Sequence, residues 1–320
     1  MGSESPQSRI WAWAGLLLVC PRLLLANGTT GADILLARVG TRASAMGQTY
    51  VALGDDLLSI QYNPAGLADL QKPAVSVLHE AAIAQVQYEY LSWGQHFPFG
   101  ALAASVTYRH MPDINNPGAV DSAVSAYDAL FTVSYADHPA RFFPQWIPPS
   151  YSDLSAGVTL KFLRSHLASY DAYTGALDAG IKKDLGGGIE GGLAVANLGP
   201  PIQFISVADP LPAEAMAGLA KELSISRNNQ LRAAGDFEYP FDGDPRMHGG
   251  IEDTLAGILA LRAGYILENA QSLGGFTAGL GIRLEQAPLV FHFDYSYQPV
   301  YYDGFSSFEP QHLLSMELEF

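Results

Sequence analysis

The chain has 320 residues and a formal net charge of −15, and only 15% of its residues are charged, although 32 are glycine and 11% are aromatic. Past residue 26 it lacks any run of the roughly 18 apolar residues that a membrane-spanning helix needs, which excludes a helical membrane protein. The surplus of acidic side chains argues against nucleic-acid binding. Low charge without long apolar runs is expected of strands that face lipid on one side and water on the other.

The N-terminus has the features of a secretory signal peptide. An apolar run over residues 10–19 is followed by the small residue Ala26, where cleavage is expected, so residues 1–26 would be absent from the mature protein. Lipidation of Cys20 is an alternative that its two flanking residues do not favour. Since Cys20 is the one cysteine of the sequence, the mature chain would have neither a disulfide nor a cysteine metal site.

Residues 27–72 follow neither the period of a clean strand nor that of a clean helix, and we predict a compact segment that is not part of the barrel wall. The acidic pair Asp55 and Asp56 precedes the apolar stretch LLSI. This arrangement favours a short helix capped by Asp55, and a divalent cation held by both carboxylates is the alternative. The segment closes on four residues that indicate a turn, Asn63, Pro64, Ala65 and Gly66.

Residues 73–320 alternate between strand-like runs and turn residues at the spacing of an all-β protein. In the run from 288 to 298, for example, aromatic and aliphatic residues alternate with His292, Asp294 and Ser296. One apolar and one polar face per strand is the pattern of a sheet. The predicted strands are 74–81, 86–97, 100–110, 125–136, 154–165, 169–184, 189–199, 213–223, 229–239, 246–254, 257–268, 274–285, 288–298 and 309–320.

Connection lengths favour a membrane barrel over a soluble sandwich, which alternation alone does not distinguish. If both termini are periplasmic, links such as 98–99 and 185–188 are the short periplasmic turns, and links such as 111–124 and 200–212 are the longer outer loops. Three links depart from this rule: 137–153 is long on the short side, and 82–85 and 166–168 are short on the long side. We therefore predict an all-β fold, a transmembrane antiparallel β-barrel of about fourteen strands.

The C-terminus supports the same prediction. Leu314, Met316, Leu318 and Phe320 alternate with polar residues up to the end of the sequence. A strand in this position is held in place if it closes the barrel against the first strand. A terminal Phe on such a strand also resembles the signal by which outer-membrane proteins reach the barrel-assembly machinery, and Phe320 is the predicted assembly signal.

The stretch RASAMGQ from Arg42, followed by TYVALGDDLLSIQYNPAGLADL, resembles the start of mature FadL-like outer-membrane proteins. It is most similar to the branch with PorV/PorQ proteins and uncharacterised FadL-like barrels of spirochaetes. The resemblance implies a fourteen-stranded barrel whose N-terminal hatch fills the lumen and which moves long-chain fatty acids or other hydrophobic molecules. It gives the acidic pair and the Asn63–Gly66 turn a gating or ligand role. Relatives in the PorV branch instead assist the export and surface attachment of proteins.

The sequence contains no recognisable catalytic set, neither G-x-S-x-G nor HExxH nor a P-loop. His292 and Ser296, which a barrel phospholipase might use, would be about 13 Å apart along one strand, too far for proton transfer. The glycines at 186–188 predict an inter-strand turn rather than a phosphate loop. Four cations are expected in the lumen, where they either meet a carboxylate headgroup or pair with acidic neighbours such as Glu285: Lys161, Arg232, Arg262 and Arg283.

The sequence therefore predicts a plugged barrel in the outer membrane of a diderm bacterium, cleaved near Ala26, that transports hydrophobic small molecules such as fatty acids. Its expected partners are outer-membrane lipid, that ligand and the barrel-assembly machinery; no enzyme activity, cofactor, metal or nucleic acid is expected. The alternative is a PorV-like protein that binds secreted cargo or a secretion apparatus. A third hypothesis is a structural or adhesive surface antigen.

Overall fold

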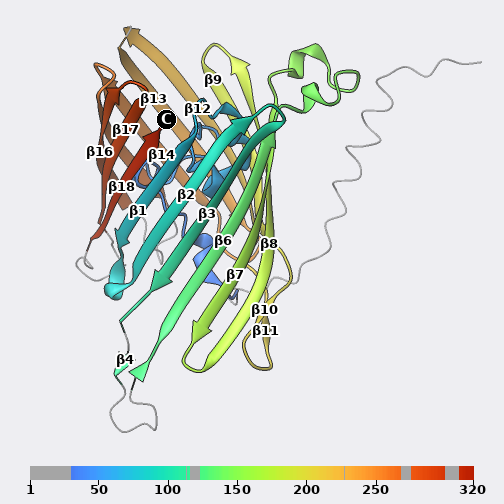
Figure 1. Ribbon diagram of the computed structural model, residues 1–320, viewed down its shortest axis with the longest axis vertical. Helices are drawn as coiled ribbons and strands as arrows, with labels where there is room; N and C mark the ends of the chain where they lie inside the picture. Colours follow the sequence, from blue (N-terminus) through green and yellow to red (C-terminus); the bar gives the residue numbers. More distant parts are fainter. Residues whose placement is uncertain (1–29, 113, 116–122, 227, 268–274, 300–309) are drawn as a thin grey trace, which may run out of the picture.

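A computed structural model describes residues 30–320 except 113, 116–122, 227, 268–274 and 300–309. The predicted signal peptide and its cleavage at Ala26 lie outside these residues. In the described part of the chain, fourteen strands form a closed antiparallel barrel in which β1 (Ala74–Ala81) pairs with β18 (Gln311–Glu319) (Figure 1). The predicted barrel of about fourteen strands is thus confirmed.

The other twelve barrel strands follow one another around the wall in chain order. They are β2 (Gln87–Phe97), β3 (Gly100–His110), β6 (Ala126–Asp137), β7 (Ser155–Leu167), β8 (Tyr170–Gly186), β9 (Ile189–Leu198), β12 (Glu214–Ser226), β13 (Asn229–Pro240), β14 (Arg246–Leu255), β15 (Leu259–Leu267), β16 (Gly275–Gln286) and β17 (Leu289–Gln298). Each coincides with a predicted strand, with ends that differ by three residues at most.

The strands bury their polar face and expose their apolar face. On β7, Thr159 and Lys161 point inward and are 0% and 8% exposed, whereas Leu160 and Phe162 point outward and are 61% and 52% exposed. A soluble protein arranges these faces the other way round, because apolar surface in water is unfavourable. The outer surface is therefore suited to lipid and the interior to polar contacts.

The two edges of the barrel differ in their connections. We call the edge with Ala74 and Glu319 the terminal rim, and the opposite edge the loop rim. At the terminal rim β8 and β9 are joined through Gly187 and Gly188, with φ of 65° and 74°, which suit a tight hairpin and confirm the predicted turn. The loop rim has the small sheets β4 (Ile114–Asn115) with β5 (Ala123–Val124) and β10 (Ile202–Gln203) with β11 (Ala208–Asp209).

One exception noted in the sequence, the long link between β6 and β7, forms a lobe at the terminal rim. This lobe contains η5 (Pro139–Arg141) and η6 (Pro149–Tyr151) and projects beside the barrel (Figure 1). Its aromatic side chains are exposed: Phe142, Phe143 and Trp146 are 48%, 55% and 73% accessible. We call residues 138–154 the aromatic lobe.

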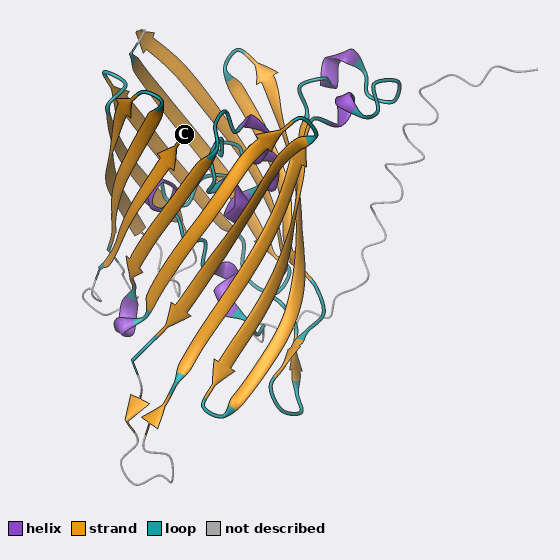
Figure 2. Ribbon diagram, viewed as in Figure 1, coloured by secondary structure: helices purple, strands orange, loops and turns teal. Residues whose placement is uncertain are grey.

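Residues 30–73 contain short helical turns rather than barrel strands (Figure 2). These are η2 (Asp33–Leu36), α2 (Thr41–Ala45), α3 (Ser59–Tyr62) and η3 (Pro64–Asp69). Across the described residues, no helix is long and apolar enough to span a membrane. The prediction that Asp55 caps a helix is wrong, because α3 begins at Ser59 and its N-cap, Leu58, makes no side-chain cap bond. Asp55 instead pairs with an arginine.

Candidate functional site

Residues 30–73 cross the inside of the barrel, and we call them the lumenal segment. At the loop rim, the Gly31 amide donates to the carbonyl of Pro210 at 3.0 Å. Further along, α2 packs against β15 to β18, and η3 packs against β3 and β6 to β8 on the other side of the wall. The segment leaves at the terminal rim, where β1 begins. Contacts with opposite walls of a closed barrel place it within the lumen.

The first anchor of the segment is Arg38, which forms ion pairs with Glu214 on β12 and Glu238 on β13. The two glutamates are also bridged by Arg246 Nη2, at 2.9 and 3.3 Å. Two cations thus meet two buried carboxylates, which offsets the cost of removing each charge from water. Arg38 does not stand out in the sequence. The available signal was the placement of Glu214 and Glu238 within predicted strands, where a carboxylate that faces inward needs a partner.

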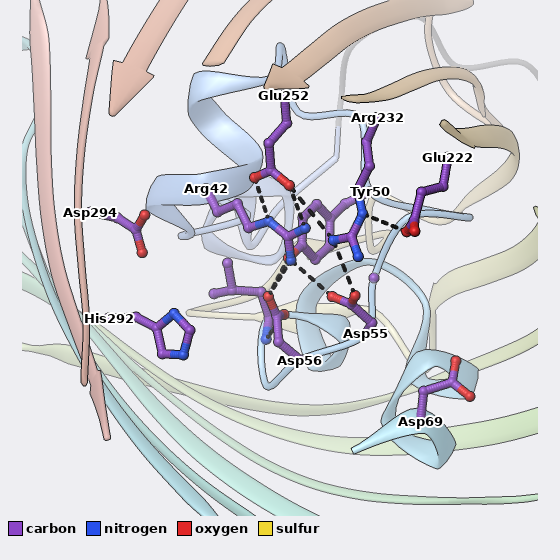
Figure 3. Close-up of polar contacts among 12 residues, drawn as sticks. Arg42, Tyr50, Asp55, Asp56, Asp69, Glu222, Arg232, Glu252, His292 and Asp294 are labelled. Carbon is purple, nitrogen blue, oxygen red and sulfur yellow. Dashed lines mark hydrogen bonds and ion pairs between the residues drawn. The ribbon is translucent and has the colours of Figure 1, made fainter. Parts of the chain in front are cut away.

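The second anchor is Arg42, in a cluster that joins the segment to β14 (Figure 3). Its Nε and Nη2 donate to the two oxygens of Glu252 at 3.0 and 2.9 Å, a bidentate arrangement. Its Nη1 donates to Asp55 at 2.8 Å and to Asp56 at 3.0 Å. The Tyr50 hydroxyl donates to Asp56. The predicted acidic pair therefore holds an arginine of the same segment.

The two neighbouring aspartates differ in their ionisation. Burial opposes the charge of Asp55, but Arg42 and Arg232 outweigh it, so the Asp55 pKa lies below its usual value. Burial raises the pKa of Asp56, and the nearby Asp55 charge raises it further despite Arg42. Asp55 is thus the charged partner of the arginines, whereas Asp56 retains a proton to a higher pH.

The charged cluster continues along the wall beyond Asp55. Arg232 Nε donates to Glu222 at 2.9 Å and its Nη1 lies 3.4 Å from Asp55. Arg262 Nε donates to Glu252 at 2.6 Å and also pairs with Asp294. Figure 3 shows Glu252 and Arg232 beside Arg42, with Glu222 next to Arg232. The result is a continuous band of alternating charge between the segment and β12 to β17.

The predicted turn is packed against a glycine floor of the wall. The Asn63 side-chain amide donates to the carbonyls of Val51 at 2.8 Å and Ile181 at 3.0 Å, and its oxygen accepts from the Ala65 amide at 3.1 Å. A Cβ added to Gly180 would collide with Asn63 Oδ1. A Cβ added to Gly66 would likewise collide with the carbonyl oxygen of Gly54.

Pro64 occupies the first turn of η3, a position that tolerates its missing amide hydrogen. Pro64, Ala65 and Gly66 are all buried. A Cβ added to Gly157 on β7 would collide with the Pro64 carbonyl, so wall and turn are in direct contact. Next to the turn, Lys182 Nζ donates to the Gly54 carbonyl and to Asp69, each at 2.9 Å. The four predicted turn residues thus connect the segment to β7 and β8.

Between the charged cluster and the terminal rim lies a cavity of about 490 Å³. Its lining is largely polar and charged: Arg42, Asp55 and Asp56 come from the segment, and Arg262 and Glu317 from the wall. Such a cavity favours water and polar groups. The segment also makes apolar contacts with the wall along its length, and at the loop rim Ile34 and Leu35 pack against β6 to β8.

The four cations expected in the lumen are all in ion pairs. Lys161 lies 2.7 Å from Asp178, and Arg283 pairs with Glu285. Arg232 and Arg262 belong to the cluster described above. The structure thus favours internal pairing over the headgroup hypothesis at these four positions.

Phe320 lies just past β18, beside the start of the barrel. Its amide donates to the carbonyl of Pro73 at 3.0 Å, which extends the pairing between the last strand and the first. The side chain is 48% exposed.

Comparison with known proteins supports the fold. Residues 26–142 match the model of a family described as Uncharacterised protein family (UPF0164). No curated protein gives a significant sequence match. The CymD monoaromatic hydrocarbon channel is 13% identical with a TM-score of 0.61, over 92% of this chain and 99% of that one. The Ralstonia pickettii toluene transporter TbuX is 11% identical with a TM-score of 0.59, over 88% and 98%.

A Pseudomonas aeruginosa FadL homologue is similar over 88% of this chain and 97% of its own, at 9% identity and a TM-score of 0.52. At sequence identities this low, the similarity shows a shared fold alone. The chain accordingly has the fold of FadL-like hydrocarbon channels, as its N-terminal sequence led us to expect.

Proposed function

We propose that the protein is an outer-membrane channel for hydrophobic small molecules, long-chain fatty acids among them, and that its lumenal segment is the gate. The outward apolar surface suits a bilayer, and the similar solved structures include a toluene transporter and a monoaromatic hydrocarbon channel. In this proposal Asp55, Asp56 and the Asn63–Gly66 turn determine the position of the gate within the lumen.

The observation that carries the proposal is the position of the lumenal segment. It fills the lumen between the loop rim, where its Ile34 and Leu35 belong to an apolar cluster, and the polar cavity at the terminal rim. Its two arginine anchors attach it to the wall through ion pairs rather than through strand pairing. Because the barrel strands pair among themselves, movement of the segment would leave the wall intact and open a path from the loop rim to the cavity at the terminal rim.

Further proposals follow from the sequence. We propose that residues 1–26 are removed on export to a diderm outer membrane, and that Phe320 is read by the barrel-assembly machinery. The PorV/PorQ branch and a spirochaete origin belong to the same proposal, since they rest on the N-terminal motif.

One observation favours a second function. The aromatic lobe exposes Phe142, Phe143 and Trp146 at the terminal rim, on the side assigned to the periplasm. Exposed aromatic clusters commonly mark sites of protein association. The lobe would then bind secreted cargo or a secretion apparatus, as in PorV-like proteins.

Deletion of residues 31–66 tests the gate. The shortened protein should fold, and its single-channel conductance in planar bilayers should exceed that of wild type, because the lumen is too wide for wall side chains to fill. Uptake of labelled oleate by cells should change at equal surface abundance. A folded deletion variant with wild-type conductance would show that the segment does not block the lumen.

Shortening the aromatic lobe by residues 140–152 is the matched control. It should leave conductance and oleate uptake unchanged, because the lobe lies beside the barrel rather than within it. Loss of a periplasmic protein that co-purifies with wild type, with uptake intact, would favour the second function.

A further inference from the structure

A groove on the outer surface of the barrel lies between the wall and the aromatic lobe, and we call it the outer groove. Its volume is about 700 Å³. It is lined by β8, β9 and β12 to β14 and by two residues of the lobe, Tyr151 and Leu154. Figure 1 shows the lobe beside the barrel at the terminal rim. Because the sheet stands between them, the outer groove is separate from the lumen and from the lumenal segment.

Small residues form the bottom of the outer groove, and large apolar residues form its sides. Gly191 pairs with Leu219, and Leu219 pairs with Gly235, in one row across β9, β12 and β13. A Cβ added to Gly235 would meet only the His248 carbonyl oxygen, at 3.7 Å, so the space above this glycine is open. The exposed apolar side chains of the groove include Leu193, Leu219, Phe237 and Met247. An alkyl chain placed here gains van der Waals contact with the protein.

Two lysines lie at the end of the outer groove that is nearest the terminal rim. Lys183 of β8 lines the groove, and its Nζ lies 2.6 Å from Asp153 and 5.2 Å from the centre of the Tyr151 ring. Lys221 of β12 donates to the carbonyl of Gly187 in the hairpin between β8 and β9. Within the described part of the chain, Lys221 forms no ion pair. The two lysines are two strands apart, roughly 10 Å across the sheet.

The acidic residues near these lysines leave a positive charge at this end of the groove. Asp153 neutralises Lys183 alone. Asp184 follows Lys183 on the other face of β8 and accepts from the Gly186 amide at 2.7 Å. Glu190 lies 2.9 Å from Lys182, on the lumenal face. Lys221 is therefore available to an anion from outside the protein.

We propose that the outer groove binds an anionic phospholipid of the periplasmic leaflet, with an acyl chain in the groove and the phosphate at Lys221 and Lys183. The terminal rim is the side assigned to the periplasm, so a lipid that lies along the wall there has its headgroup at the level of the lysines. An ammonium group offers three donors to phosphate oxygens, and basic pockets at a membrane surface bind anionic headgroups. The site lies outside the lumen and does not depend on the proposed channel.

The composition of the lobe agrees with this position. Tyrosine and tryptophan concentrate at the headgroup level of membranes, and the lobe carries Trp146 and Tyr151 there. The side of the lobe that faces the barrel lines the groove through Tyr151 and Leu154. The lobe thus covers one side of the bound lipid while the wall covers the other.

Native mass spectrometry of the folded protein in detergent tests the proposal, with phosphatidylglycerol and phosphatidylcholine of identical acyl chains titrated separately. Wild-type protein should bind phosphatidylglycerol about fivefold more tightly or better, because only this lipid carries a net negative charge. Lys221→Gln should lower the phosphatidylglycerol affinity about fivefold and leave the phosphatidylcholine affinity unchanged. Lys72→Gln is the matched control: Lys72 precedes β1 at the same rim, outside the groove, and its loss should change neither affinity.

Gly235→Leu tests the part of the site that holds the chain. A leucine side chain fills the open space above Gly235, so both lipids should bind about tenfold more weakly. Gly175→Leu is the control, since Gly175 lies on β8 outside the groove and an added Cβ has its nearest contact at 3.4 Å. Heat-modifiable migration checks that each variant is folded, and Gly235→Ala replaces the leucine variant if that variant does not fold.

Two results would overturn the proposal: equal affinities of wild type for the two lipids, or unchanged lipid binding in the folded Gly235 variant. The same variants distinguish a protein ligand from a lipid. If Lys221→Gln and Gly235→Leu leave lipid binding unchanged but abolish the co-purification of a periplasmic protein, the outer groove binds protein instead.

Discussion

At the scale of single residues, the lumen is organised by buried charges that come in balanced sets. Such pairs add little net stability, because desolvation offsets their attraction, but removal of one partner is costly. Arg42 illustrates this, since it serves Glu252 of the wall and Asp55 and Asp56 of the segment at once. The arrangement fixes the position of the segment more than it raises the stability of the barrel.

The opposite pKa directions of Asp55 and Asp56 predict a pH dependence. Asp56, whose folded pKa is raised, stabilises the docked segment at low pH, and this contribution is lost as pH rises through that pKa. Asp55, whose folded pKa is lowered, stabilises the docked segment above its unfolded pKa of about 3.9. This contribution is lost as pH falls through the folded pKa. The protection of residues 50–62 against amide hydrogen exchange, measured relative to the intrinsic exchange rate at each pH, should therefore be greater at pH 5 than at pH 7.

Two substitutions separate these contributions. Asp56→Asn should remove most of the difference in hydrogen-exchange protection of residues 50–62 between pH 5 and pH 7. In Asp55→Asn, protection should still be greater at pH 5 than at pH 7. The free energy for opening residues 50–62 should fall by on the order of 1 kcal/mol, a value reduced for the partial exposure of Asp55. Greater protection at pH 7 than at pH 5 in wild type, relative to the intrinsic exchange rate, would contradict the assignment.

At the scale of elements, the strands were predictable because their alternation is local. An alternation of polar and apolar residues over ten positions predicts which face of a strand is buried, whichever strands lie next to that strand. The lumenal segment was not predictable in this way, since its conformation is set by partners far along the chain, such as Glu252 for Arg42. The Asn63 turn was visible as a turn, but the glycine floor beneath it was not, because single glycines on two strands, Gly157 and Gly180, have no common sequence pattern.

That floor gives a prediction for Gly180. Gly180→Ala introduces a Cβ against Asn63 Oδ1, so the turn must shift and lose its bonds to Val51 and Ile181. The free energy for opening residues 50–69 to hydrogen exchange should fall by about 1–3 kcal/mol. Gly249→Ala is the control: it lies on the outer face of β14 with nothing within 4 Å of the added Cβ. Equal protection in both variants would show that the turn does not depend on the floor.

At the scale of the whole molecule, the barrel closes through its first and last strands. β1 pairs with β18 over its full length, and the Phe320 amide extends the ladder to Pro73. The bond made by Phe320 is a backbone bond, and its side chain faces out at 48% exposure. The ring therefore contributes little to the folded barrel, which leaves recognition during assembly as its proposed role.

Phe320→Ala should accordingly lower the fraction of newly made protein that inserts into the membrane. The inserted molecules should still show heat-modifiable migration on gels, since every strand edge remains paired. Phe276→Ala, which removes an outward ring 67% exposed on β16, is the control and should insert normally. Normal insertion of Phe320→Ala would rule out the assembly signal.

The path of the lumenal segment has a topological consequence. A barrel with an even number of strands returns the chain to the side on which it started, so the two ends of the wall share one face of the membrane. Here the chain first passes through the centre, from the loop rim at Gly31 to the terminal rim at Ala74. This extra passage makes the number of crossings odd. The expectation that both termini are periplasmic therefore holds for the two ends of the wall and not for residue 30. Labels placed at residue 30 and after Phe320 would be accessible from opposite sides of the membrane in one molecule.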